Sequence, residues 1–258
     1  MLVPNLGTCE ASQRQALFCV HDRVLSFSVQ ERKGQQDEMS QRFSQELLEA
    51  NRDTWDEAIN HRFVTELFEG TIDDAVMAGY LDQDYRFFEA FLQLLGAAIT
   101  TADRLDARLR YASFAGEMVN SEDTYFQRAF DALGVTDELR ASTPDTPSAG
   151  GFVDLMREAA SSQNYSAVVA VLMVTECLYR DWAARAPENH PESFVHHEWI
   201  TLHDNPDFLS FATFLEQEAD RSGAQDAETA HDFFRRAVEL ELGFFNDTYK
   251  YPLKGIHA

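Results

Sequence analysis

Apolar residues recur every three or four positions over most of the chain, a spacing that places side chains on one face of an α-helix. Between residues 39 and 143 this pattern continues without a proline, which predicts long helices. Its stripes comprise Phe43, Leu47, Leu48 and Trp55, then Tyr80, Phe87, Phe88, Phe91 and Leu95, then Leu105, Leu109, Ala112 and Met118. We expect the second helix to begin at Thr71, after Gly70, with Asp73 and Asp74 in its first turn.

The second half of the chain is separated by a loop rich in Pro, Ser and Gly at residues 142–151. Helical patterns then cover residues 152–162 and 165–185, and the latter segment is apolar on nearly every side, which predicts a buried central helix. Further helices are expected at 192–203, from Pro206, and at 226–249. Because strand alternation and hairpin signals are absent, the predicted fold class is an all-α bundle.

Residues 1–38 differ from the rest, since they lack a sustained helical period and end in a polar stretch at 30–38. We interpret them as a flexible leader or the product of a misassigned start codon, with a short docked segment as the alternative. Residues 39–258 are expected to form a single helical domain.

Charge restricts the partners of the protein. Its 258 residues include 21 basic and 44 acidic side chains, a formal net charge of −23. Phosphate backbones and anionic membranes would repel such a chain, so we expect no nucleic-acid or membrane partner. The sequence has no run of about 18 apolar residues and no signal-peptide pattern, which predicts a soluble cytoplasmic protein. Three cysteines without a CxxC pair predict neither a disulfide framework nor structural zinc.

The basic residues are unevenly divided, with lysine only at Lys33, Lys250 and Lys254 and arginine elsewhere. An acidic, lysine-poor composition is typical of proteins from salt-accumulating halophiles, in which high salt screens the repulsion between acidic groups. An acidic enzyme from a mesophile is the alternative.

Three carboxylates occupy helix positions that the apolar pattern assigns to the interior: Asp84, Glu176 and Glu241. Burial without a partner is costly for a carboxylate and raises its pKa into the range useful for acid–base catalysis. These residues are therefore candidates for a catalytic site.

The segments around these acids resemble the TenA (thiaminase II) family from about residue 39 to 249. The resemblance is carried by Trp55-Asp-Glu-Ala-Ile-Asn-His-Arg-Phe-Val, by Leu67-Phe-Glu-Gly-Thr71, by Tyr80-Leu-Asp-Gln-Asp-Tyr and by Glu241-Leu-Gly-Phe-Phe-Asn-Asp-Thr-Tyr249. It implies a haem-oxygenase-like helical bundle, a homotetramer, and hydrolysis of aminopyrimidines in thiamin salvage.

The resemblance also implies roles for individual residues. Asp84 matches an aspartate that hydrogen-bonds the pyrimidine edge, Glu241 the C-terminal acid–base glutamate, and Tyr179 the tyrosine one turn after a catalytic cysteine. Thr175 stands where that cysteine is expected, and Glu176 beside it resembles the subgroup that uses glutamate instead.

The implied reaction is hydrolysis of 4-amino-5-aminomethyl-2-methylpyrimidine or its N-formyl form to hydroxymethylpyrimidine. Glu241 would donate the proton, Glu176 would activate water or add covalently, and Tyr179 would hold Glu176 or the leaving group. Pocket aromatics and a histidine are expected at Phe87, Phe152, Phe244 and His203. No metal or cofactor is required.

Two alternatives stay open at this point. One is a haem-oxygenase-like oxidase, di-iron or cofactor-free; the Glu-x-x-His spacing of a di-iron site occurs at Glu228 and His231, without a second copy. The other is a pyrimidine-binding or regulatory protein without catalysis.

Overall fold

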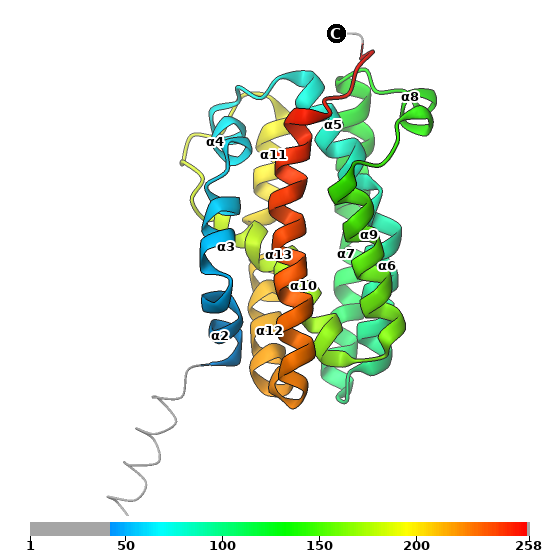
Figure 1. Cartoon of the computed structure of the whole chain (residues 1–258). Coiled ribbons are helices and arrows are strands. Elements are labelled where there is room, and N and C mark those ends of the chain that lie inside the picture. Colours follow the sequence, from blue (N-terminus) through cyan, green and yellow to red (C-terminus); the bar gives the residue numbers. More distant parts are fainter. Residues whose placement is uncertain (1–41, 257–258) are drawn as a thin grey trace, which may run out of the picture. The chain divides into compact units, whose positions relative to one another are not determined.

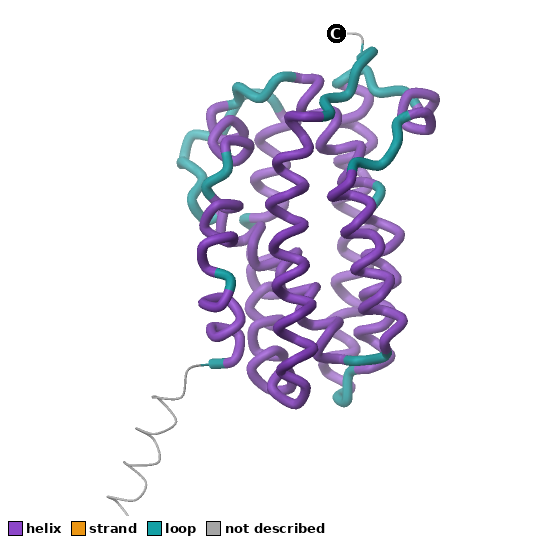
Figure 2. Tube along the Cα trace, viewed as in Figure 1, coloured by secondary structure: helices purple, strands orange, loops and turns teal. Residues whose placement is uncertain are grey.

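The computed structural model describes residues 42–256, and the segment 1–38, for which we predict a leader or a misassigned start, lies outside this range. Every regular element within the described range is helical, which confirms the all-α prediction (Figure 2). The helices are α2 (Phe43–Ala50), α3 (Arg52–Ile59), α4 (Arg62–Glu69), α5 (Asp74–Tyr85), α6 (Phe87–Thr101), α7 (Leu105–Ala132), α8 (Asp137–Ser142), α9 (Pro147–Ser162), α10 (Tyr165–Ala183), α11 (Phe194–His203), α12 (Pro206–Ser222), the short 3-10 helix η1 (Gly223–Asp226) and α13 (Ala227–Lys250).

Helix α10 is the centre of the bundle, as its apolar sequence predicts. It packs against α13, α12, α6 and α9, and every residue from Val168 to Val174 is buried. The long helices α6, α7, α9, α10, α12 and α13 run roughly alongside one another (Figure 1). A helix enclosed on all sides turns every residue toward a neighbour, so any polar side chain on it faces protein or an internal cavity.

The region expected to form long helices begins with short ones, because the apolar period continues across three breaks. Asn51 and Asn60 leave helical geometry, and Gly70 ends α4 with a left-handed φ of 65°. The helix expected from Thr71 begins at Asp74. Asp73 is its N-cap and accepts a 2.9 Å hydrogen bond from the backbone N–H of Ala75.

The loop expected at residues 142–151 is shorter than predicted. Helix α9 begins at Pro147, and Thr146 caps it by accepting a hydrogen bond from the backbone N–H of Ala149. Proline is favourable in the first turn because the backbone N–H that it lacks has no intrahelical partner there. The prolines of this segment therefore start a helix as well as interrupt one.

The apolar stripe expected on α7 was assigned to the wrong face. Leu105 and Leu109 are 71% and 61% exposed, and Ala112 is also exposed. The buried face of this helix is displaced around its axis and is formed by Ala107, Tyr111, Phe114, Met118 and Tyr125. Leucine occurs on the outer face and alanine or tyrosine on the inner one, so the identity of the apolar residues misled the prediction.

The segment after α13 is hydrogen-bonded to the start of α5. The backbone N–H of Leu253 donates a 2.8 Å hydrogen bond to the carbonyl of Ala75. A Cβ atom added to Gly79 would lie 3.0 Å from the Leu253 nitrogen, so glycine permits the close approach. This contact fixes the helix that carries Asp84.

Candidate active site

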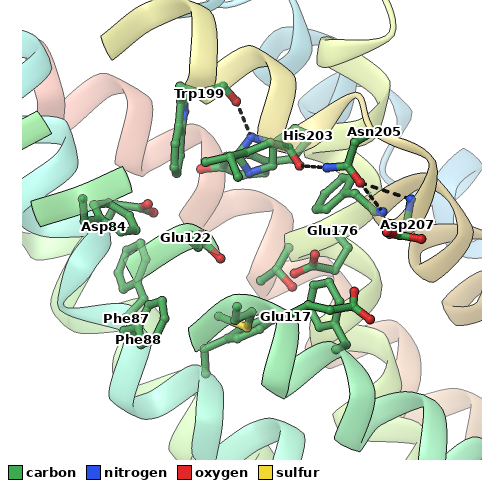
Figure 3. A pocket seen from close by; sticks show the side chains of 18 of the residues that line it. Asp84, Phe87, Phe88, Glu117, Glu122, Glu176, Trp199, His203, Asn205 and Asp207 are labelled. Atoms are coloured by element: carbon green, nitrogen blue, oxygen red, sulfur yellow. Dashed lines mark hydrogen bonds between the residues drawn. The ribbon is translucent and has the colours of Figure 1, made fainter. Parts of the chain in front are cut away.

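A cavity of about 700 Å³ lies among the long helices. Helices α5 to α7, α9 and α10 to α13 all contribute to its walls. The residues relevant to chemistry that line it are Asp84, Phe87, Phe88, Glu117, Glu122, Phe152, Thr175, Glu176, Tyr179, Trp199, His203, Asn205, Asp207 and Glu241 (Figure 3). Asp84, Glu176 and Glu241, which the sequence selects on three separate helices, therefore meet at one cavity.

A fourth carboxyl, Glu122, completes this group. It comes from α7, whereas Asp84, Glu176 and Glu241 come from α5, α10 and α13. Glu176 and Glu241 are buried, and Asp84 and Glu122 are half-buried. Figure 3 shows the carboxyl of Glu122 directed into the cavity between Asp84 and Glu176.

Burial and mutual repulsion disfavour ionisation of all four carboxyls in the empty site, and a bound positive charge would restore it. Burial raises the pKa of Asp84, Glu176 and Glu241 well above the ordinary values, and burial raises that of Glu122 to about 7. Mutual repulsion adds to burial, since Glu122 acts on Asp84 and Glu176, and Asp84 acts on Glu241. The lining contains no arginine or lysine to offset this repulsion. Such a site favours a ligand that brings positive charge or hydrogen-bond donors.

Glu241 is the most confined of these acids. It is 2% exposed, and its Oε2 atom has no hydrogen-bond partner in the described part of the chain. An unpaired polar atom at this depth is costly unless a ligand or proton satisfies it. Glu241 is thus suited to hold a proton and to transfer it to a bound molecule.

Tyr179 lies one helical turn after Glu176 and is held by neighbours on other helices. Its hydroxyl shares a 2.8 Å hydrogen bond with that of Tyr80, and its ring centroid lies 4.8 Å from that of His203. Burial, with added repulsion from acidic neighbours, raises the pKa of Tyr179, so the phenol remains protonated. It is available as a donor toward the cavity or toward Tyr80.

His203 lies where the sequence predicts a pocket residue. Its Nδ1 is 2.8 Å from the carbonyl of Trp199, which accepts only, so Nδ1 carries the proton. Burial lowers the pKa of His203 to about 4, which keeps the ring neutral and leaves Nε2 as an acceptor.

Aromatic rings close one side of the cavity. The ring centroid of Phe87 lies 5.4 Å from that of Phe152, and both rings line the cavity. The structure does not place Phe244 among the lining residues: it lies behind Phe87, 4.9 Å away between centroids. Phe244 is instead enclosed in the core, where it packs against Phe87 and against Tyr80, 5.1 Å between centroids.

Asp82 and Cys177 are close in sequence to the site acids, but their side chains do not line the cavity. Asp82 is buried but pairs with Arg86 at 2.9 Å and does not line the cavity. Cys177 follows Glu176 yet lies in the protein interior, where its Sγ atom is 3.6 Å from the carbonyl of Ala212. Neither side chain reaches the site.

Glu122 is the functional candidate that sequence reasoning missed. It follows Phe114 and Met118 at positions i+8 and i+4, on the buried face of α7. A carboxyl on that face is the same signal that identifies Asp84. The predicted stripe of α7 joins Met118, which is buried on this face, to Leu105 and Leu109, which are exposed, so it does not show that Glu122 faces the interior.

The arrangement of potential ligands does not resemble a metal centre. Within residues 42–256, no group of three or more His, Cys, Asp or Glu side chains is placed to hold a metal ion. His231 of the Glu-x-x-His motif instead pairs with Glu46 at 3.1 Å near the surface.

The described helices also include none with the length and apolar character needed to cross a bilayer.

Two proteins named as aminopyrimidine aminohydrolases are similar to this chain in sequence. An aminopyrimidine aminohydrolase from Bacillus subtilis is 23% identical over 159 residues, covering 62% of this chain and 67% of its own. A second, from Halalkalibacterium halodurans, is 20% identical over 216 residues, covering 80% and 95% respectively.

Solved structures share the fold. A TenA homologue from P. horikoshii OT3 superposes with a TM-score of 0.73 at 19% identity, over 81% of this chain and 99% of that one. A domain from Shewanella denitrificans described as having a heme oxygenase-like fold gives 0.58 at 17% identity, over 80% and 91%. The bundle is therefore haem-oxygenase-like, as predicted. Because the model of the TENA/THI-4/PQQC family matches residues 48–251, this chain belongs to that family.

Proposed function

We propose that this protein is an aminopyrimidine aminohydrolase that forms hydroxymethylpyrimidine by releasing ammonia from 4-amino-5-aminomethyl-2-methylpyrimidine or formamide from its N-formyl form. The observation that carries the proposal is the meeting of Asp84, Glu176 and Glu241 at one aromatic-walled cavity without a basic residue in its lining. The similarity to two aminopyrimidine aminohydrolases supports the same reaction class.

Ring recognition is assigned to Asp84 and the aromatic wall. Asp84 lies beside Phe87 in the lining, so a flat heterocycle against Phe87 and Phe152 can present its amino group or ring N–H to the carboxyl. His203 Nε2 is a second acceptor for a substrate donor.

Glu176 and Glu241 divide the chemistry of C–N cleavage. Water adds oxygen to the exocyclic methylene carbon as the C–N bond breaks, and nitrogen departs with the bonding electron pair as ammonia or, from the formyl compound, formamide. Glu176 removes the proton from water or adds covalently to the carbon, and Glu241 supplies a proton to a departing nitrogen that is not already protonated, such as that of the formyl compound. Tyr179 holds Glu176 or the departing nitrogen by hydrogen bonding, and the reaction requires no cofactor.

We further propose a homo-oligomer in which a second copy covers the outer face of α7. Leu105, Leu109, Ala112 and Val119 are exposed at spacings of four, three and seven residues, a pattern that two packed helices bury between them.

The test is release of hydroxymethylpyrimidine, with ammonia from the aminomethyl pyrimidine and formamide from the formylaminomethyl pyrimidine, measured in molar salt. Turnover by the wild type that falls by at least about 1,000-fold in Glu176→Gln supports the proposal. Cys177→Ala is the matched control, adjacent on α10, and should retain turnover. A folded wild type that binds these pyrimidines without turnover would favour the regulatory alternative, and bound iron would favour the oxidase.

A further inference from the structure

Glu122 has no role in the reaction as proposed above, yet its position is unusual for a structural residue. It lines the cavity from α7, on the helix face that otherwise carries Phe114 and Met118. No hydrogen bond or ion pair involves its carboxyl within the described residues, whereas its neighbour Asp123 accepts a 2.8 Å hydrogen bond from the Tyr85 hydroxyl. A carboxyl that contributes nothing to packing and repels its neighbours is explained by a ligand that it binds.

The groups around Glu122 define what that ligand must carry. They are Asp84 from α5, Glu117 from its own helix, Glu176 and Tyr179 from α10, His203 from α11, Asp207 from α12 and Glu241 from α13. None is basic at neutral pH, since burial lowers the pKa of His203 to about 4. Glu117 is paired with Arg110 at 3.6 Å, but the described lining itself contains no arginine or lysine. A cation in this space would therefore face acidic groups from several helices.

The position of Glu122 along the cavity indicates which part of the substrate it meets. Asp84 and Phe87 lie at one end, where the ring is assigned, and Glu176 lies across the cavity, where the bond is broken (Figure 3). Glu122 is directed between them (Figure 3). The substituent that joins ring to leaving nitrogen must pass through this space.

We infer that Glu122 binds the charged amino group of the substrate and makes the site select the free aminomethyl pyrimidine over its neutral N-formyl form. The inference rests on the proposed function and assigns a specificity residue within it. A primary ammonium offers three donors and a full charge to Glu122 and Glu176, whereas a formamide offers one N–H and a carbonyl oxygen that these carboxylates repel. The cationic substrate would thus offset the repulsion between Glu122 and Glu176.

Binding to a protein that cannot react separates this inference from the proposed function. In a Glu176→Gln background, we expect Glu122→Gln to weaken binding of the aminomethyl pyrimidine by roughly 10- to 100-fold, measured by calorimetry. Binding of hydroxymethylpyrimidine, which has the same ring and no charged substituent, should change by less than about twofold, because no charge-assisted bond is lost. Glutamine removes repulsion and keeps the side-chain shape, so the variant is expected to fold.

Turnover provides the second measurement. In the otherwise wild-type protein, Glu122→Gln should lower the ratio of kcat/KM for aminomethyl over formylaminomethyl substrate by roughly 10-fold or more. Asp123→Asn is the matched control, because it removes the same charge from the next residue of α7 and should leave the ratio unchanged.

The outcomes are distinct. An unchanged preference in Glu122→Gln, an equal effect of Asp123→Asn, or a wild type that prefers the formyl compound would overturn the inference while the hydrolase stands. A wild type without turnover of either compound would overturn the proposed function instead.

Discussion

The hydroxyl groups of Tyr80 and Tyr179 share a 2.8 Å hydrogen bond between α5 and α10, deep in the interior. The ring of Tyr80 lies against Phe63, 4.2 Å between centroids, so its hydroxyl is rigidly placed. The bond holds Tyr179 at a set orientation one turn from Glu176. Helix α5, which carries Asp84, and helix α10, which carries Glu176, are therefore joined by this bond.

Loss of this bond should reduce both stability and turnover. Tyr80→Phe leaves the ring in place, and we expect it to cost about 1 kcal/mol of unfolding free energy and to lower kcat several-fold because Tyr179 is less well oriented. Denaturant unfolding and steady-state kinetics check this. Tyr111→Phe removes a similar 2.9 Å bond to Tyr165 away from the cavity, and it should lower stability alone.

Asp82 and Asp84 lie two residues apart on α5. Substitution of Asp82 should lower stability and preserve substrate binding, whereas substitution of Asp84 should preserve stability and lower substrate binding. Asp82→Asn breaks a buried ion pair with Arg86 and should cost about 2 kcal/mol of unfolding free energy while leaving the cavity intact. Asp84→Asn relieves repulsion and should keep or raise stability, yet lose most substrate affinity. Melting curves and ligand titration on both variants test this; parallel behaviour would contradict the assignment of Asp84.

Ionisation of Glu122 should destabilise the ligand-free protein as pH rises toward neutrality. Burial raises the folded-state pKa of Glu122 from its ordinary 4.5 to about 7, so this group binds more protons in the folded state than in the unfolded state between these values. The penalty is absent below pH 4.5 and complete above 7, and it amounts to about 3 kcal/mol for this group. His203 acts in the opposite sense, because burial lowers its pKa to about 4. The unfolding free energy of the wild type should therefore fall relative to that of Glu122→Gln in this window, with both measured against pH.

High salt should stabilise the protein. The net charge of −23 makes the acidic side chains repel one another. At about 1 M salt the Debye screening length falls to about 3 Å, so this repulsion acts only between close neighbours. We expect the Tm to rise between 0.1 and 2 M KCl, and to rise much less with sucrose, which does not screen charge. Equal effects of the two solutes would contradict the electrostatic explanation, and the halophilic origin stays a prediction.

The outer face of α7 should control assembly. Leu105 and Leu109 are exposed in the single chain. Replacement of both by glutamate should convert an oligomer into a species of lower mass in light scattering, while helix content stays unchanged. A wild type that is already monomeric would contradict the proposed contact.

Much of the candidate site follows from the sequence because a carboxyl on an apolar helix stripe is a conspicuous exception. Asp84, Glu176 and Glu241 could be selected in this way, since their helices are apolar enough to show which face is buried. On α7 two faces carry apolar residues, and the periodicity alone cannot show which one neighbouring helices cover. Glu122 was missed for this reason.

Helix ends were harder to predict than helix faces. The apolar period crosses Asn51, Asn60 and Gly70 without interruption, so the breaks depend on local backbone geometry. Gly70 also lies against Pro191, where an added Cβ would come within 2.9 Å of the proline Cβ. That contact joins segments far apart in the sequence, which no local pattern reports.

The burial of Cys177 has a consequence for the environments in which this site can operate. Thiol nucleophiles are disabled when peroxide or disulfides oxidise the thiolate, and exposure and a low pKa make them vulnerable. Here burial raises the pKa of Cys177, and the described cavity lining contains no thiol. Carboxyls do not undergo this oxidation, so the proposed C–N hydrolysis by Glu176 and Glu241 would not be lost through oxidation of a thiol.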